Sequence, residues 1–249
     1  MGRLEGKTAV VTGGSSGIGL ASAKRFAAEG AFVYVFARRQ AELEAAVTAI
    51  GVRAKGVQGD ISKPEDLDRL FAAVRADKGV IDVLFANAAD GNFAPLGAIT
   101  AEQVDQVFGV NVKGTLFTVQ KALPLLKAGS SIILTGSTTG TTGTAAFSVY
   151  GASKAAIRNF ARSWAVDLKG TGIRVNVLVP GPTETAGLMG FLEKTGMKKA
   201  LVDGLIAQTV LGRMGDPDET AAAALFLASD DSSFMTGSEV FVDGGQAQI

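Results

Sequence analysis

The sequence predicts an α/β fold in which a seven-stranded parallel sheet is doubly wound, with helices on both faces. Seven short apolar runs, rich in β-branched and aromatic residues, alternate with Ala-rich segments of helical apolar spacing. The runs are nearly continuous in apolar residues, which is typical of parallel strands buried on both faces. We therefore expect one domain over residues 1–249, built around a single sheet.

Each apolar run is expected to form one strand, and each intervening segment is expected to supply helices, because parallel strands need long crossovers. The expected strands cover 8–12, 32–37, 54–59, 82–87, 131–136, 174–179 and 239–244. Residues 101 to 127 are expected to form one helix.

The segment 183–215 interrupts the alternation with a mixture of Gly, Met, Leu and Phe. A surface helical hairpin would explain it. We favour a lid over a substrate pocket, because ligands of such folds bind beyond the carboxyl ends of the strands.

The composition limits the catalytic groups that this chain can use. The chain has no cysteine and no histidine. This excludes disulfides, thiol nucleophiles, a Ser-His-Asp triad and histidine-bearing zinc sites, and we expect no metal. Acid–base chemistry near neutral pH must then use a carboxylate, a lysine or a tyrosine.

Charge and hydropathy indicate a small-molecule partner. The 24 basic and 24 acidic residues cancel and no basic run appears, so we expect no nucleic-acid partner. No apolar stretch reaches the roughly 18 residues of a membrane helix. The first strand is expected to begin at Thr8, which leaves no room for a signal peptide, so we expect a cytoplasmic location.

A glycine-rich loop follows the first expected strand in "VVTGGSSGIGLASAKRF". Its glycines leave the backbone bare where a dinucleotide pyrophosphate would approach, and the following helix points its free N–H groups at that anion. A glycine-rich turn without a ligand is the alternative. The loop residues expected at the cofactor are Gly13, Ser15, Ser16, Gly17, Ile18 and Gly19.

The end of the second expected strand favours NADP(H), with NAD(H) the less favoured cofactor. Folds that select NAD usually carry an acidic residue here, but this chain has Ala37 followed by Arg38 and Arg39. An arginine can bind a 2′-phosphate in bidentate fashion, whereas an aspartate would repel it. The alternative is a pair of solvated surface arginines.

Tyr150 and Lys154 lie four residues apart in a helical segment and so share one face. A free phenol titrates near pH ~10, and a neighbouring ammonium group is expected to lower that pKa. Tyr150 would then give a proton to a carbonyl oxygen in reduction, or accept one in alcohol oxidation. An ordinary surface pair is the alternative.

These motifs resemble the short-chain dehydrogenase/reductase family over essentially the whole chain, which implies a Rossmann-like fold. The glycine signature is complete from Thr12 to Gly19. "ANAA" at 86–89 matches the family's Asn-Asn-Ala-Gly run only in part. The resemblance implies further cofactor contacts at Asp60, Ile61, Asn87, Ala88 and Ala89, at Tyr150 and Lys154, and at Pro180, Gly181 and Thr183 near the nicotinamide.

The family's catalytic tetrad maps onto Asn111, Ser137, Tyr150 and Lys154. The resemblance implies that Asn111 holds a water that relays protons to Lys154. Ser137 is expected to stabilise charge on the substrate oxygen. The Tyr-x-x-x-Lys spacing argues against the enoyl reductase branch. By resemblance we expect a homotetramer, or failing that a dimer.

We expect a neutral ketone or secondary alcohol as substrate, because the candidate pocket residues are mostly apolar. Lys194, Lys198 and Arg213 lie in the insert and keep charged substrates open. A cofactor-binding sensor or regulator, and a non-redox lyase or epimerase, are the alternatives on this fold. The expected pocket residues are Phe93, Ser137, Thr139, Ala145, Phe147, Tyr150, Leu188, Met189, Phe191 and Leu192.

Overall fold

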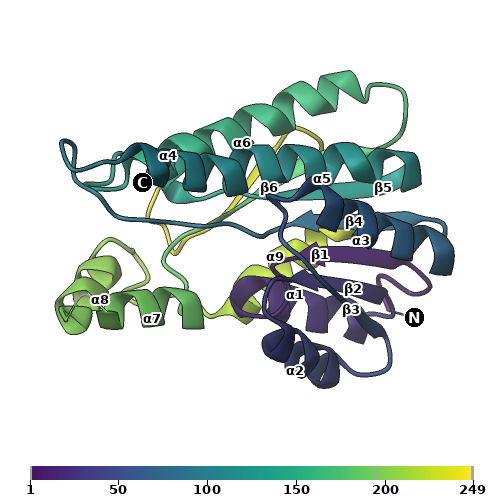
Figure 1. Cartoon of the computed structure of the whole chain (residues 1–249), viewed down its shortest axis with the longest axis horizontal. Coiled ribbons are helices and arrows are strands. Elements are labelled where there is room, and N and C mark those ends of the chain that lie inside the picture. The colour runs from purple at the N-terminus through teal and green to yellow at the C-terminus, as the bar shows by residue number, and fades with distance from the viewer. Residues whose placement is uncertain (1, 195, 248–249) are drawn as a thin grey trace.

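A computed structural model describes residues 2–194 and 196–247 and contains the predicted seven-stranded parallel sheet (Figure 1). The strand order is β3-β2-β1-β4-β5-β6-β7, so the direction of winding reverses between β1 and β4. The strands are β1 (Thr8–Thr12), β2 (Phe32–Ala37), β3 (Ala54–Gln58), β4 (Ile81–Ala86), β5 (Leu126–Thr135), β6 (Arg174–Pro180) and β7 (Glu239–Val242). Each overlaps its predicted run, and β5 begins five residues earlier than predicted.

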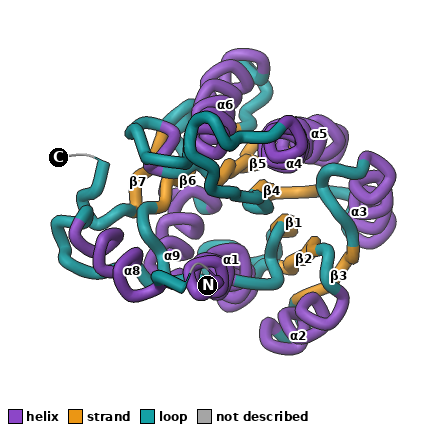
Figure 2. Tube along the Cα trace, turned by 60° about the vertical axis from the view of Figure 1, so that its left-hand side comes forward, coloured by secondary structure: helices purple, strands orange, loops and turns teal. Residues whose placement is uncertain are grey.

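Helices cover both faces of the sheet, as predicted (Figure 2). Helices α1, α2 and α9 lie on one face, and α3 to α6 lie on the other. The helices are α1 (Gly17–Ala28), α2 (Gln40–Ile50), α3 (Pro64–Asp77), α4 (Ala101–Phe108), α5 (Thr115–Ala122), α6 (Ser148–Asp167), α7 (Ala186–Lys194), α8 (Lys198–Ala207) and α9 (Pro217–Ala228). No helix among the described residues is long and apolar enough to cross a membrane.

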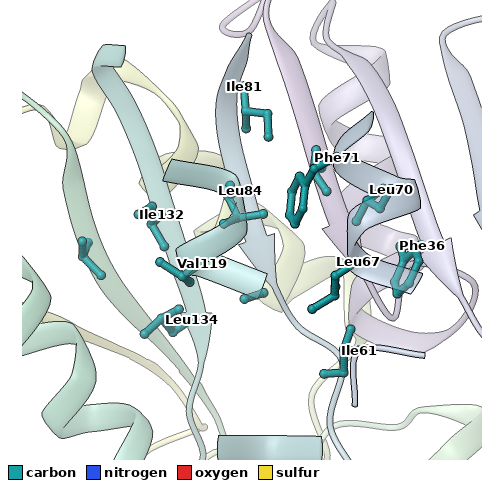
Figure 3. Packing of buried hydrophobic residues seen from close by; sticks show 14 of the residues in the cluster. Phe36, Ile61, Leu67, Leu70, Phe71, Ile81, Leu84, Val119, Ile132 and Leu134 are labelled. Atoms are coloured by element: carbon teal, nitrogen blue, oxygen red, sulfur yellow. The ribbon is translucent and has the colours of Figure 1, made fainter. Parts of the chain in front are cut away.

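Two buried apolar clusters flank the sheet and explain why the strands are apolar on both faces. Val10 packs on the side of α3, α5 and α6, whereas its neighbour Val11 packs on the side of α1 and α9. Figure 3 shows the first cluster, in which Leu67 and Phe71 of α3 approach Leu84 of β4. Burial on both faces fixes the sheet and so the positions of the loops at its carboxyl edge.

The helix predicted over 101 to 127 is interrupted, which corrects that expectation. Helix α4 ends at Phe108, and Gly109–Gly114 form a π-helical turn before α5 begins. The chain then makes a 3₁₀ turn over Leu123–Leu125 and enters β5 at Leu126. Such π turns are frequent at functional sites, and this one contains Asn111.

The segment 183–215 forms two helices, α7 and α8, which lie side by side (Figure 1). Its two ends are joined by a β-bridge between Thr183 and Gly215. The bridge is supported by hydrogen bonds from Gly215 N–H to the Pro182 carbonyl (2.9 Å) and from Glu184 N–H to the Gly215 carbonyl (2.8 Å). The two ends of the insert therefore form a closed base.

Candidate active site

Asn87 joins the carboxyl ends of three neighbouring strands. Its backbone N–H donates to Thr12 Oγ1 at the end of β1, and its side-chain amide donates to the Thr12 carbonyl, both at 3.1 Å. Thr135 Oγ1 at the end of β5 donates to Asn87 Oδ1 (3.3 Å). Ala88 also donates its N–H to Thr12 Oγ1, whereas Ala89 is exposed. The predicted cofactor residues Asn87, Ala88 and Ala89 therefore lie at the edge where β1, β4 and β5 end.

The predicted phosphate loop has a tightly folded backbone. Gly13 and Gly17 take left-handed conformations with φ of 65° and 53°. A Cβ on Gly19 would lie 2.3 Å from the Gly13 carbonyl oxygen. Ser16 precedes α1 without capping it through its side chain, and the first turn holds no acidic residue.

This loop fits an anionic dinucleotide. The free N–H groups and positive dipole end of α1 face the turn formed by Ser15, Ser16 and Ile18, and the first turn of α1 carries no acidic residue to neutralise them. Gly17 leaves room for Thr185, whose side chain would lie 3.1 Å from a Cβ there. The insert therefore begins directly beside the loop.

The substitution Gly19→Ala is expected to weaken cofactor binding roughly tenfold or more, because the new Cβ forces the loop backbone out of position. Titration of the cofactor's fluorescence would measure this. Gly204→Ala is the matched control, since a Cβ at Gly204 meets no atom within 4 Å. Equal affinities for the two variants would contradict a cofactor role for the loop.

Arg38 and Arg39 differ in their surroundings. Arg38 is mostly exposed, and its Nη1 lies 3.9 Å from Asp60 Oδ2. Arg39 is paired with Glu42 in the first turn of α2 (3.1 Å). Asp60 is fixed by Ser62, whose N–H and Oγ both donate to Oδ1. Arg38 is therefore the arginine better placed to meet a phosphate near Asp60, while the side chain of Ile61 is buried in the core.

Ser137 and Tyr150 are brought together by close packing between α6 and the turn that follows β5. The Ser137 hydroxyl hydrogen-bonds the Tyr150 phenol, and Thr139 donates to Ser137 Oγ from its own hydroxyl (2.9 Å). A Cβ on Gly151 would lie 2.8 Å from the Thr139 carbonyl oxygen. Glycine at 151 thus allows α6 to approach the serine turn, which gives the small residues around Tyr150 a structural role.

Lys154 is buried on the same helix, with 2% of its surface exposed. Its Nζ donates to the Thr135 carbonyl (2.8 Å) and lies 5.5 Å from the centroid of the Tyr150 ring. No carboxylate pairs with it in the part of the chain that the structure describes. Burial lowers the pKa of Lys154 to about 7.

The pKa of Tyr150 moves opposite to the predicted direction. Burial raises it to about 12, and the hydrogen bond with Ser137 opposes this only in part. The expected lowering by Lys154 does not appear, because Lys154 is itself poorly able to hold its charge where it is buried. In the protein chain alone, Tyr150 is therefore protonated at neutral pH.

Asn111 lies in the π-helical turn between α4 and α5, and it is fixed by contacts to the loop that follows β4. Its Oδ1 accepts the Asp90 N–H (2.7 Å), and its Nδ2 donates to the Asp90 carbonyl (2.8 Å) and to Ser153 Oγ (2.9 Å). Ser153 Oγ donates in turn to the Tyr150 carbonyl (2.6 Å). Asn111 thus connects to the Tyr150 helix through Ser153, and among the described residues it makes no direct hydrogen bond to Lys154.

Three of these partners, Asp90, Thr135 and Ser153, were not among the predicted site residues. Asp90 and Thr135 contribute backbone groups, which carry no residue-type signal. Ser153 was detectable, because it lies three residues after Tyr150 in the motif "YGASK" and so shares a helix face with it.

The residues expected near the nicotinamide lie where β6 ends. Pro180 is the last residue of β6 and pairs with Val242 of β7. Gly181 donates its N–H to the Val242 carbonyl (3.0 Å), and Thr183 Oγ1 donates to the Gly181 carbonyl (3.1 Å). Because β6 neighbours β5, this corner lies at the same edge of the sheet as Ser137.

The expected pocket residues are only partly gathered at Tyr150. Phe147 lies 4.8 Å from the Tyr150 ring between centroids, and Thr139 contacts Ser137. Ala145 is exposed, and Leu188 and Met189 are half-buried on α7. The pocket role of these last three stays a prediction.

Comparisons with known proteins find similar oxidoreductases over nearly the whole chain. A family model described as "Enoyl-(Acyl carrier protein) reductase" matches residues 13–247. "Oxidoreductase asL5" of Sarocladium schorii is 57% identical over 249 residues, covering 99% of this chain and 98% of that protein.

Two solved structures are similar over nearly the whole chain. One, titled "short chain dehydrogenase/reductase family protein", is 38% identical with a TM-score of 0.87 and covers 99% of this chain and 100% of its own. The other, the crystal structure of levodione reductase, is 28% identical with a TM-score of 0.95 and covers 98% of this chain and 99% of its own. Together with the glycine loop and the paired Ser137 and Tyr150, these matches show that the chain belongs to the short-chain dehydrogenase/reductase family of nicotinamide-dependent oxidoreductases.

Proposed function

We propose that this protein is an NADP(H)-dependent carbonyl reductase or secondary-alcohol dehydrogenase with Tyr150 as its general acid and base. The hydrogen-bonded pair of Ser137 and Tyr150, beside the buried Lys154, carries this proposal. Tyr150 and Lys154 lie on α6, and Ser137 lies in the turn that follows β5. If Tyr150 and Lys154 were an ordinary surface pair, neither the burial of Lys154 nor the contact between Ser137 and Tyr150 would be needed.

The residues at the carboxyl edge of the sheet fit a nicotinamide dinucleotide. The tight glycine loop and the α1 N-terminus suit its pyrophosphate, and Arg38 suits a 2′-phosphate. When bound, the cofactor supplies or accepts the hydride. Asn87 and the Pro180–Thr183 corner would hold its nicotinamide end, in line with their places at the ends of β4 and β6.

The site's own groups handle the proton. Tyr150 is protonated at neutral pH and so can donate to the carbonyl oxygen of a ketone. The Ser137 hydroxyl, which hydrogen-bonds the phenol in the free site, can turn its one proton to the same oxygen and stabilise its developing charge. Lys154, with a pKa of about 7, exchanges protons readily near neutral pH and can restore the Tyr150 proton.

The Tyr-x-x-x-Lys spacing favours carbonyl chemistry over reduction of an enoyl double bond. The four-residue spacing places Tyr150 and Lys154 one turn apart on α6, with Ser137 aimed at the same phenol. A donor pair on one oxygen is what a carbonyl needs as it becomes an alkoxide. One solved relative is named as a reductase of levodione.

Isotopic labelling tests the proposed reaction. NADPH carrying deuterium at the transferred position should produce an alcohol one mass unit heavier at the carbinol carbon. A lyase or epimerase would release product without the label. A sensor would release no product at all.

Replacing Arg38 with Asp is expected to lower NADPH affinity roughly 10- to 100-fold and NADH affinity far less, because a charge-assisted phosphate contact becomes repulsive. Fluorescence titration with both cofactors would measure this. Arg39→Asp is the control, since Arg39 is already paired with Glu42, and its effect should be smaller. Equal losses for NADPH and NADH in Arg38→Asp would refute the phosphate contact.

We also propose that the insert 183–215 is a substrate lid, within one catalytic domain. Its closed base at Thr183 and Gly215, and its start beside Gly17, support this. The family resemblance supports a homotetramer, and the cytoplasmic location stays a prediction from the sequence.

A further inference from the structure

Four aromatic rings form a continuous row that begins at Tyr150. Phe147 lies 4.8 Å from Tyr150, Phe93 lies 3.9 Å from Phe147, and Phe191 lies 4.8 Å from Phe93, all between ring centroids. The rings come from three segments that are far apart in sequence. Tyr150 and Phe147 lie at the start of α6, Phe93 lies in the loop after β4, and Phe191 lies on α7.

The row is held by the backbone as well as by ring contacts. Ala94 donates its N–H to the Ala146 carbonyl (2.9 Å), which ties the loop carrying Phe93 to the loop carrying Phe147. Ala146 has φ of 59° and is the one left-handed residue other than glycine among those described. Such strain persists only where surrounding contacts enforce it, and it clusters at functional sites. Phe93 and Phe147 are thus preorganised relative to Tyr150.

Part of the ring surface in this row is exposed, so another ring can pack against it. Phe93 is 41% exposed, and Phe147 and Phe191 are half-buried. A purely structural aromatic cluster would bury these faces, as the core does with Phe26 and Phe85. Apolar ring surface next to a reactive phenol indicates a substrate contact.

The charges of the insert do not compete with this apolar surface. Lys198 is paired with Glu193 (3.2 Å), and Arg213 is paired with Glu219 (2.6 Å). The side chain of Lys194, a third predicted cation, lies outside the described residues. Because Lys198 and Arg213 are each paired with a glutamate, neither offers a free charge to a substrate, and this favours an uncharged substrate.

We propose that Phe93, Phe147 and Phe191 form an aromatic wall beside Tyr150 that selects ketones bearing a flat, uncharged aryl group. The inference rests on the proposed function, because Tyr150 must hold the carbonyl oxygen while the carbonyl substituent lies along the wall. Planar rings gain offset-stacked or edge-to-face contacts with phenylalanine that a saturated ring of similar size does not. Those contacts correspond to roughly a two- to tenfold preference.

A matched pair of ketones tests the wall. Acetophenone and cyclohexyl methyl ketone share a carbon skeleton and differ in whether the ring is planar. The ratio of their kcat/KM values would be measured with NADPH for the wild type, Phe93→Leu and Phe191→Leu. We expect the aryl preference to fall in each variant, by at most the roughly two- to tenfold that the ring contacts contribute. Intrinsic reactivity cancels, because only the change in the ratio between proteins is compared.

Phe160→Leu is the matched control for these variants. Phe160 stacks on Trp164 with 4.7 Å between ring centroids, so its loss removes a comparable ring contact from α6, six residues beyond Lys154. The aryl preference should be unchanged in this variant. Thermal unfolding of all three variants would show that each is folded, and Phe147→Leu provides a second ring at the wall should either of the others unfold.

Saturation-transfer NMR with the same two ketones gives a readout that does not need turnover. If neither ketone is reduced, but acetophenone receives more saturation and loses that advantage in Phe93→Leu, the wall stands and the proposed function fails. If both ketones are reduced and the ratio is the same in Phe93→Leu, Phe191→Leu and wild type, the proposed function stands and the wall is overturned. The rings would then serve only to pack the insert against the loop.

Discussion

Replacing Tyr150 with phenylalanine is expected to lower kcat for ketone reduction by about 10²- to 10⁴-fold, the usual contribution of a positioned general acid. The substitution removes one hydroxyl and keeps the ring that packs on Phe147. Cofactor affinity should change little, because the glycine loop and Arg38 lie elsewhere at the sheet edge. Absorbance at the nicotinamide band would report turnover, and cofactor fluorescence would report binding.

Tyr34→Phe is the matched control, since Tyr34 is the other tyrosine of the chain. Its hydroxyl donates to Asp77 (2.9 Å) on the face of the sheet covered by α3. This variant should lose some stability but keep its turnover. Tyr150→Phe with turnover within a fewfold of wild type would remove Tyr150 from the mechanism.

Replacing Lys154 with methionine is expected to abolish most activity and at the same time to stabilise the fold at neutral pH. The buried ammonium group is unfavourable, because burial lowers the pKa of Lys154 from 10.5 to about 7. A difference of this size corresponds to roughly 5 kcal/mol as an upper bound, from which the hydrogen bond to the Thr135 carbonyl, worth about 1 kcal/mol, must be subtracted. Methionine fills a similar volume without a charge.

The pH dependence of this effect has a definite sign. Between pH 7 and 10.5 the unfolded chain binds more protons at Lys154 than the folded chain does, so wild-type stability should rise with pH in this window. The advantage of Lys154→Met should be full at or below pH 7 and should shrink as the pH approaches 10.5. Denaturant unfolding at several pH values would measure it.

Lys24→Met, at an exposed position on α1, is the control and should show no such window. A Lys154→Met protein that is less stable than wild type at pH 7 would contradict the account. It would show that the lysine supports the fold and not only the chemistry.

The sheet could be predicted from the sequence because burial on both faces leaves a direct signature. Val10 and Val11 face opposite clusters, so neither position tolerates a polar residue. Strand β5 begins earlier than predicted because its first residues, from Leu126 to Gly129, are mixed in polarity. Its pairing with β4 is irregular between Ile81 and Val83.

The interruption after Phe108 could not be predicted from helical periodicity. It depends on Asn111 satisfying both backbone groups of Asp90, a contact between segments 21 residues apart. The same limit applies to Tyr150. Its spacing from Lys154 predicts proximity, but the direction of its pKa depends on burial, which no local pattern reports.

The candidate site could be predicted residue by residue from its motifs, whereas its connections could not. Ser137 and Tyr150 lie together as the motifs imply. Phe93, Phe147 and Phe191 could each be predicted as apolar pocket residues, but their ordering into one row depends on how three distant segments pack.

The most direct test of the central claim is absorbance at the nicotinamide band, with the wild-type protein, a panel of ketones and alcohols, and NADPH and NADH run in parallel. We expect ketone-dependent oxidation of NADPH, with NADH slower. If the protein binds NADPH and yet no ketone or alcohol in a broad panel changes the absorbance, the proposed oxidoreductase activity at Tyr150 is contradicted.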